Sequence, residues 1–146
     1  MAEATLAAIR RILLAILIVG LAGMATELVF LEHYEDVWQY APLVASALGF
    51  GFGGWYARSP TRTSLRAFKA VLGLFVVTGI VGLVLHYRAN VEFEVERDSA
   101  LGGIRLFWEA LGGAMPALAP GTMVLLAAIG FAVIVSRQEP LASPRA

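Results

Sequence analysis

The chain has 146 residues, of which 59% are hydrophobic, and its mean hydropathy is +0.76. Soluble domains are about half apolar, so a chain this hydrophobic would overfill one water-facing core and is expected to lie in a lipid bilayer. Eleven basic and eleven acidic residues give no net charge, which argues against a nucleic-acid partner. Cysteine is absent, which excludes thiolate nucleophiles and cysteine-ligated metals.

Four apolar stretches, each flanked by charged residues, predict an all-α integral membrane protein with four transmembrane helices. About 20 helical residues cross the roughly 30 Å hydrocarbon layer. The spans should be helical because lipid offers no hydrogen-bond partner to the backbone. Neighbouring helices should be antiparallel within a single domain, residues 1–146. The predicted spans are residues 12–31, 37–57, 67–87 and 114–135.

Basic residues lie mainly on one side of this four-span topology. Only Arg88, Arg97 and Arg105 fall on the other side. Both termini are therefore predicted to be cytoplasmic, as in a multi-pass protein of a bacterial cytoplasmic (inner) membrane. Residues 136–146 are predicted to form a disordered cytoplasmic tail. The basic residues on the side of the termini are Arg10, Arg11, Arg58, Arg62, Arg66, Lys69, Arg137 and Arg145.

The N-terminus also fits a second interpretation. Arg10 and Arg11, the apolar run after them and the small residues around Met24 resemble a cleavable signal peptide. The apolar run is longer than the usual signal core of about 7 to 15 residues, so we prefer a first span that is retained.

Residues 90–113 form the sizeable segment outside the predicted spans. Valine or phenylalanine alternates with glutamate over residues 91–96, which predicts a short extended stretch with one acidic face. Ile104, Phe107, Trp108 and Leu111 repeat at helical spacing, which predicts a short amphipathic helix lying in the plane of the outer headgroups.

Small residues recur along the second and third spans, and such faces allow close approach of another helix. We expect them to be helix-packing surfaces. Aromatic residues near the span ends are expected to lie at the membrane interfaces. The small residues are Ala45, Gly49, Gly53, Ala57, Gly79 and Gly82, and the interfacial aromatic residues are Trp38, Tyr40, Trp55, Tyr56 and Trp108.

Glu27, Ser46, Thr78 and Thr122 are predicted to form a sparse polar layer in the outer half of the bundle, with one residue from each span. Glu27 should face protein, because a carboxylate is costly to expose to lipid. In a functional interpretation the layer would relay protons or hold an ion or a quinone. We prefer the structural interpretation, in which the hydroxyl groups bond to carbonyl groups of their own helices and Glu27 is protonated or reaches the interface.

His33 and His86 follow the outer ends of the first and third spans, which run in the same direction, so their depths should match. Two imidazoles at one level are the ligands of a b-type haem or a divalent metal, and Glu32, Glu35 and Asp36 would add oxygen ligands. We favour ordinary headgroup contacts for both imidazoles and predict no cofactor, with the bound haem or metal as the alternative.

No combination of residues in the sequence predicts a catalytic site, and we expect no catalytic residue. The favoured function is that of a noncatalytic accessory or scaffold subunit, associating with itself or with other membrane subunits through small-residue helix faces. The alternatives are an electron-transfer protein using the two histidines and a small proton-coupled carrier centred on Glu27.

Overall fold

The structure, a computed structural model, describes residues 2–136 and is helical throughout its regular elements. This confirms the predicted all-α class. Residues 137–146, which hold all of the predicted tail except Ser136, lie outside the described part. The elements are α1 (Ala2–Phe30), the 3₁₀ helix η1 (Val37–Gln39), α2 (Tyr40–Arg58), α3 (Arg62–Arg97), α4 (Gly103–Leu111) and α5 (Gly121–Val135).

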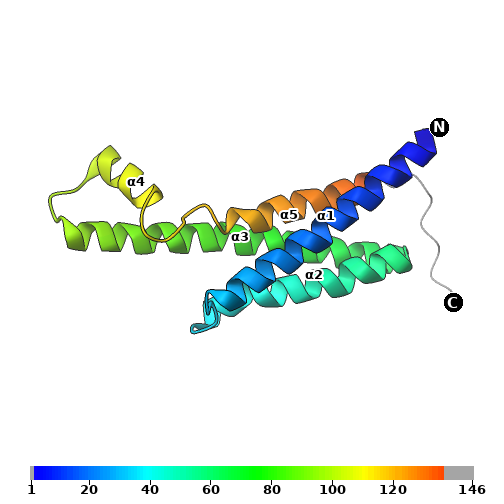
Figure 1. The fold of residues 1–146 in the computed structure, drawn as a ribbon, viewed down its shortest axis with the longest axis horizontal. Helices are drawn as coiled ribbons and strands as arrows, with labels where there is room; N and C mark the ends of the chain where they lie inside the picture. The colour runs from blue at the N-terminus through cyan, green and yellow to red at the C-terminus, as the bar shows by residue number, and fades with distance from the viewer. Residues whose placement is uncertain (1, 137–146) are drawn as a thin grey trace.

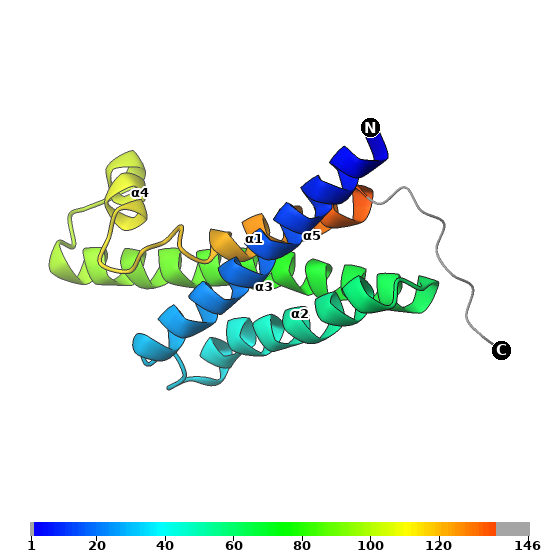
Figure 2. The same ribbon diagram turned by 45° about the vertical axis from the view of Figure 1, so that its right-hand side comes forward.

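Four of the helices close a ring in the order α1, α2, α3, α5, each packing against the two beside it. Figure 1 shows that α1 begins, α2 ends, α3 begins and α5 ends at one end of this bundle. Helices that follow one another in the ring therefore run in opposite directions. The opposite end holds the turn from α1 to α2 and the start of α5, and α3 continues past it (Figures 1 and 2).

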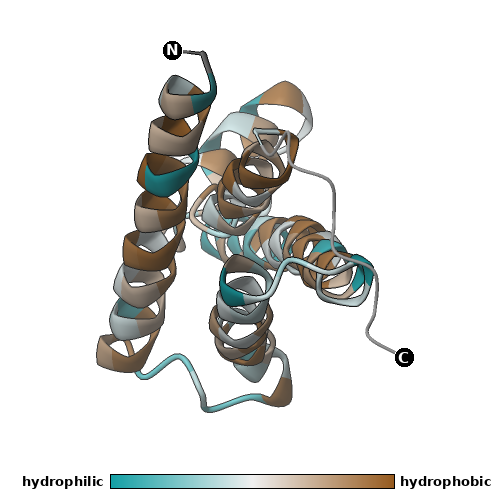
Figure 3. Cartoon of the chain, turned by 90° about the vertical axis from the view of Figure 1, so that its right-hand side faces the viewer, coloured by the Kyte–Doolittle hydropathy of each residue, from teal (hydrophilic) through white to brown (hydrophobic). Residues whose placement is uncertain are grey.

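The core of the bundle is apolar and is centred on α3. Phe68, Leu72 and Phe75 are fully buried there. Tyr56 of α2 stacks on Phe68 with ring centroids 5.5 Å apart. The outward faces are also apolar, with Ile12 and Val19 exposed on α1. Figure 3 shows that hydrophobic residues recur along the length of α1.

Two helices among residues 2–136 are long and apolar enough to span a membrane, not the four that were predicted. They are the segment Glu3–Phe30 of α1 and the whole of α3, Arg62–Arg97. Helix α2 has sufficient length, at 19 residues, but its glycines and terminal aromatic residues lower its hydropathy. Helix α5 is very apolar but has only 15 residues, or about 22 Å.

The predicted start of the fourth span, residue 114, is wrong. Helix α5 begins at Gly121, directly after Pro120, and turns and a bend occupy most of residues 112–120. Pro116 and Pro120 lack the amide hydrogen that a helix running through them would need, so the helix starts after the second proline.

The predicted extended stretch at residues 91–96 is also wrong, because α3 continues as a helix to Arg97. The alternation does not decide the conformation: Phe93 and Val95 are exposed, whereas Glu94 is buried and pairs with Arg97. No glycine or proline lies between Gly82 and Asp98. Extending an existing helix is easy, since each added residue gains a hydrogen bond without a new nucleus.

The predicted amphipathic helix is present as α4, which packs against the last part of α3. Ala110 is buried against this extension, and Phe107 contacts Tyr87 with ring centroids 5.9 Å apart. In both ribbon views α4 lies beyond the turn from α1 to α2 (Figures 1 and 2). Its position in a headgroup plane stays a prediction.

Candidate functional site

His33 is placed by a tight turn that ends α1. The amide of His33 donates to the carbonyl of Leu28 at 2.9 Å, and the amide of Glu32 donates to that of Val29 at 3.1 Å. These two bonds define a Schellman motif, in which the residue at the position of Glu32 adopts the left-handed conformation. Glu32 has φ of +51°, which is strained for a residue with a side chain. The turn therefore fixes the position of His33 at a cost to the backbone.

His86 is placed by α3 and by the segment before α5. Its Nδ1 lies 3.3 Å from the carbonyl oxygen of Pro116, a residue 30 positions later in the chain. The rings of His33 and His86 are adjacent, with centroids 6.1 Å apart and planes inclined at 57°. Both side chains are half-buried. The structure thus brings the two predicted histidines together at the junction of three segments.

Burial lowers the pKa of His33, because a half-buried site disfavours the charged imidazolium, and the charge of the nearby His86 lowers it further. His33 is therefore held in its neutral form at neutral pH, with a lone pair on one ring nitrogen.

The carboxylates predicted to join the histidines do not form a cluster with them. Within residues 2–136 no group of three or more acidic or histidine side chains is arranged to hold a metal ion. Asp36 has a structural role: its Oδ1 accepts a hydrogen bond from the amide of Trp38 at 3.0 Å and caps η1. Glu32 and Glu35 are exposed.

The four residues of the predicted polar layer are not joined by hydrogen bonds in the described part of the chain. Ser46 is buried and donates to the Pro42 carbonyl of its own helix at 2.6 Å. Thr78 is half-buried, whereas Thr122 and Glu27 are exposed. Glu27 therefore lies on the outward side of α1 and not against the other helices, and a functional role for these residues stays a prediction.

The small-residue faces are occupied by helices of the same chain. A Cβ atom at Gly49 would lie 2.5 Å from Cζ of Phe75, and one at Gly53 would lie 3.2 Å from Cε2 of Phe68. Gly79 and Gly82 similarly face the start of α5 at Pro120. Ala45 is buried in the core, but Ala57 is exposed. Gly49, Gly53, Gly79 and Gly82 are thus not available to another protein.

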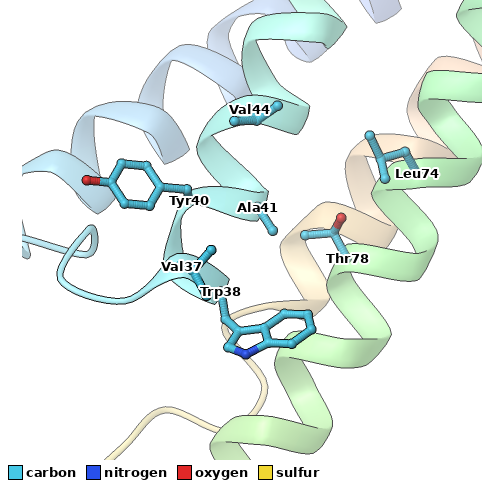
Figure 4. Close-up of a pocket in the computed structure, with 7 residues that line it drawn as sticks. All are labelled: Val37, Trp38, Tyr40, Ala41, Val44, Leu74 and Thr78. Atoms are coloured by element: carbon cyan, nitrogen blue, oxygen red, sulfur yellow. The ribbon is translucent and has the colours of Figure 1, made fainter.

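The predicted interfacial aromatic residues occupy different environments. Tyr56 is in the core, whereas Trp55 and Trp108 are exposed. Trp38 and Tyr40 line an open apolar groove of about 430 Å³ between the start of α2 and α3 (Figure 4). Thr78 contributes one of the few polar atoms of this groove. The full lining is Val37, Trp38, Tyr40, Ala41, Val44, Leu74 and Thr78.

Asn90, which the sequence interpretation did not single out, is the most densely hydrogen-bonded side chain near the site. It is buried, and its amide nitrogen donates to the carbonyl groups of Ala110 at 2.9 Å and Met115 at 2.7 Å. Its amide oxygen accepts from the Met115 amide at 2.9 Å. Asn90 is the only asparagine in the chain, and it stands next to an apolar helical run, which is the signal that could have marked it.

The chain has no significant similarity to a known protein family, to a curated protein or to a solved structure.

Proposed function

We propose that this chain is a noncatalytic integral membrane protein, an accessory subunit of a membrane complex in a bacterial cytoplasmic membrane. All four helices of the ring would cross the bilayer, with both termini in the cytoplasm. The α3 extension and α4 would lie on the outer side as a platform for a partner subunit.

Membrane insertion is supported by the outward faces of the ring. Val19 of α1, Val77 of α3 and Leu125 of α5 are each more than half exposed, and burying such side chains in lipid is favourable. The short α5 still fits a spanning role if the apolar residues just before it complete the crossing. In that segment Ala117 is buried, and turn hydrogen bonds from Gly121 to Leu118 and from Thr122 to Ala119 pair part of the backbone.

Orientation is supported by the ends at which the basic residues gather. Arg58 at the end of α2 and Arg62 and Arg66 at the start of α3 share one end of the bundle, where α5 also ends (Figure 1). Arg97 and Arg105 belong to the other end. An excess of arginine and lysine marks the cytoplasmic side.

The accessory role rests on one observation, the rigid attachment of α4 outside the ring. Asn90 bonds to Ala110 at the end of α4 and to Met115 after it, so α4 is held on the α3 extension. Ile104 and Trp108 remain 72% and 62% exposed on this helix. A fixed helix that presents two large apolar residues is typical of a docking surface for another helix or subunit.

Topology can be tested with single cysteines, because the natural chain has none. Arg66→Cys and Glu92→Cys both replace exposed residues of α3. A membrane-impermeant maleimide added to intact cells should label residue 92 and not residue 66. Labelling of both positions from one side, or recovery of the protein without detergent, would contradict a spanning bundle.

The accessory role can be tested by the size of the native complex in mild detergent. Ile104→Ser with Trp108→Ser should release the partner and lower the mass of the complex, while Arg105→Ser, on the polar side of α4, should not. A partner subunit lost from the double variant would support the proposal, and loss of a second copy of this chain would assign the surface to self-association. An unchanged complex would overturn the assignment of α4 as the docking surface.

A further inference from the structure

We propose that His33 and His86 together bind one divalent transition-metal ion through their imidazole nitrogens. The pair joins the turn after α1 to the middle of α3 and to the segment before α5, with ring centroids 6.1 Å apart. This inference concerns a different part of the chain from α4 and does not depend on the accessory role.

The contact of His86 with Pro116 leaves Nε2 of His86 as the nitrogen that can bind a metal ion. A carbonyl oxygen only accepts hydrogen bonds, so in the neutral ring Nδ1 carries the proton and donates to Pro116 across 3.3 Å. The lone pair is then on Nε2. Histidines that bind metals usually donate their second ring N–H to a carbonyl or carboxylate, which fixes the tautomer and the ring orientation. His86 has this arrangement.

The second ligand is held by the backbone. The Schellman bonds from His33 to Leu28 and from Glu32 to Val29 fix the chain at the residue that carries the imidazole. The left-handed Glu32 shows that the chain accepts strain at this position. The turn is a common way to end a helix, and here it holds the backbone of His33 in a fixed place beside His86.

The spacing of the rings suits a shared ion. Bonds from zinc to imidazole nitrogen are about 2.0–2.1 Å, so two imidazoles on one ion have centroids roughly 5 to 6 Å apart. The observed 6.1 Å is close to this range. Both side chains are half-buried, so water can reach the ion and complete its coordination.

The ligand type selects the metal. No third acidic or histidine ligand joins the pair within residues 2–136, and the chain has no cysteine. Two imidazoles with water suit Cu²⁺, Ni²⁺ and Zn²⁺, whereas Ca²⁺ and Mg²⁺ prefer several oxygen ligands. Among the divalent ions of the first row Cu²⁺ should bind most tightly.

The test uses the full-length protein in detergent after removal of any histidine tag, because His33 and His86 are then the only histidines. Titration calorimetry with Cu²⁺, Zn²⁺ and Mg²⁺ should show one site for Cu²⁺ and for Zn²⁺ and none for Mg²⁺. Electron paramagnetic resonance of the Cu²⁺ form should show coupling to two imidazole nitrogens.

Two variants separate binding from folding. His33→Phe keeps an aromatic ring without a ligand nitrogen, and His86→Asn keeps an amide donor for the Pro116 carbonyl. Each should weaken Cu²⁺ binding by roughly tenfold or more, with the thermal midpoint of the metal-free protein little changed. Glu35→Gln is the control and should bind as the natural chain does.

A stoichiometric Cu²⁺ signal with one imidazole nitrogen or none, or unchanged affinity in His33→Phe, would overturn the proposal. If His86→Asn fails to fold, two results still test the proposal. They are the number of imidazole nitrogens coupled to Cu²⁺ in the natural chain and the Cu²⁺ affinity of His33→Phe.

Discussion

Asn90 and Met115 exchange two hydrogen bonds: the Asn90 amide nitrogen donates to the Met115 carbonyl at 2.7 Å, and the Met115 amide donates to the Asn90 amide oxygen at 2.9 Å. A third bond runs from Asn90 to the carbonyl of Ala110. One side chain thus bonds to three backbone groups, one in the last turn of α4 and two in the irregular segment after it. It joins α4 and the approach to α5 onto the α3 extension.

Asn90→Ala should detach α4 from α3. Removing the side-chain amide takes the partner from the Met115 amide and carbonyl, whereas the Ala110 carbonyl keeps its bond from the Gly113 amide at 3.5 Å. The cost is roughly 1–3 kcal/mol for each unpaired group that water cannot reach. Hydrogen exchange followed by mass spectrometry should show faster exchange at residues 103–117 and little change in the ring of four helices. Glu92→Ala, at an exposed position two residues along the same helix, is the control, and equal exchange in the two variants would contradict this role.

Gly79→Ala should weaken the packing of α3 on α5. The added methyl would lie 2.9 Å from the Pro120 carbonyl oxygen and 2.8 Å from Cγ2 of Val124, and the backbone atom has little freedom to move away. Overpacking of this kind costs about 1–3 kcal/mol. The measurement is the free energy of unfolding in mixed micelles.

The matched control is Gly73→Ala, on the same helix, where an added Cβ meets no atom within 4 Å. Alanine favours a helix over glycine by about 1 kcal/mol, so this variant should be neutral or more stable. If Gly79→Ala were as stable as Gly73→Ala, the close approach of α5 at this point would be refuted.

The existence of the helices followed from the apolar runs, but their ends did not. Residues 91–96 alternate as a strand would, and yet they are helical, because the helix that contains them meets no glycine or proline between Gly82 and Asp98. Residues 114–120 are uncharged like the helix after them, but two prolines keep them out of it. Periodicity and hydropathy report burial, whereas helix ends depend on single residues.

The candidate site could also be predicted only in part from the sequence. The matching depth of the two histidines could be inferred from two parallel spans, but their contact depends on how α3 approaches the turn after α1. The carboxylates beside His33 looked equally suitable as ligands. Asp36 instead caps η1, a role fixed by the local backbone and not by the composition of the turn.

Glu32→Gly should stabilise the fold if the turn before His33 is strained. Glycine adopts positive φ at no steric cost, whereas other residues pay about 1 kcal/mol or more, partly offset by the greater freedom of glycine in the unfolded chain. Asparagine tolerates this conformation better than most residues, so Glu32→Asn should lie between the two. Glu32→Ala should gain nothing. Thermal unfolding of the three variants tests the order, and an alanine variant as stable as the glycine variant would show that the turn is unstrained.

Stability should fall as the pH is lowered through the range just below 6.5, the ordinary pKa of histidine. Burial and the charge of His86 lower the pKa of His33 in the folded state, so over this range the unfolded chain binds more protons than the folded one. Acid therefore favours unfolding there, and the stability is restored as the pH rises above 6.5.

The measurement is the midpoint of thermal unfolding between about pH 5 and pH 7.5 in metal-free detergent solution. His33→Phe keeps a ring beside His86 but has no proton to bind, so the midpoint should depend less on pH in this variant than in the natural chain. If the midpoint depended on pH equally in His33→Phe and in the natural chain, titratable groups other than His33 would cause the pH dependence. Because a bound metal ion competes with protons for the same nitrogen, added Zn²⁺ should raise the midpoint more at pH 7.5 than at pH 5, and only when both histidines are present.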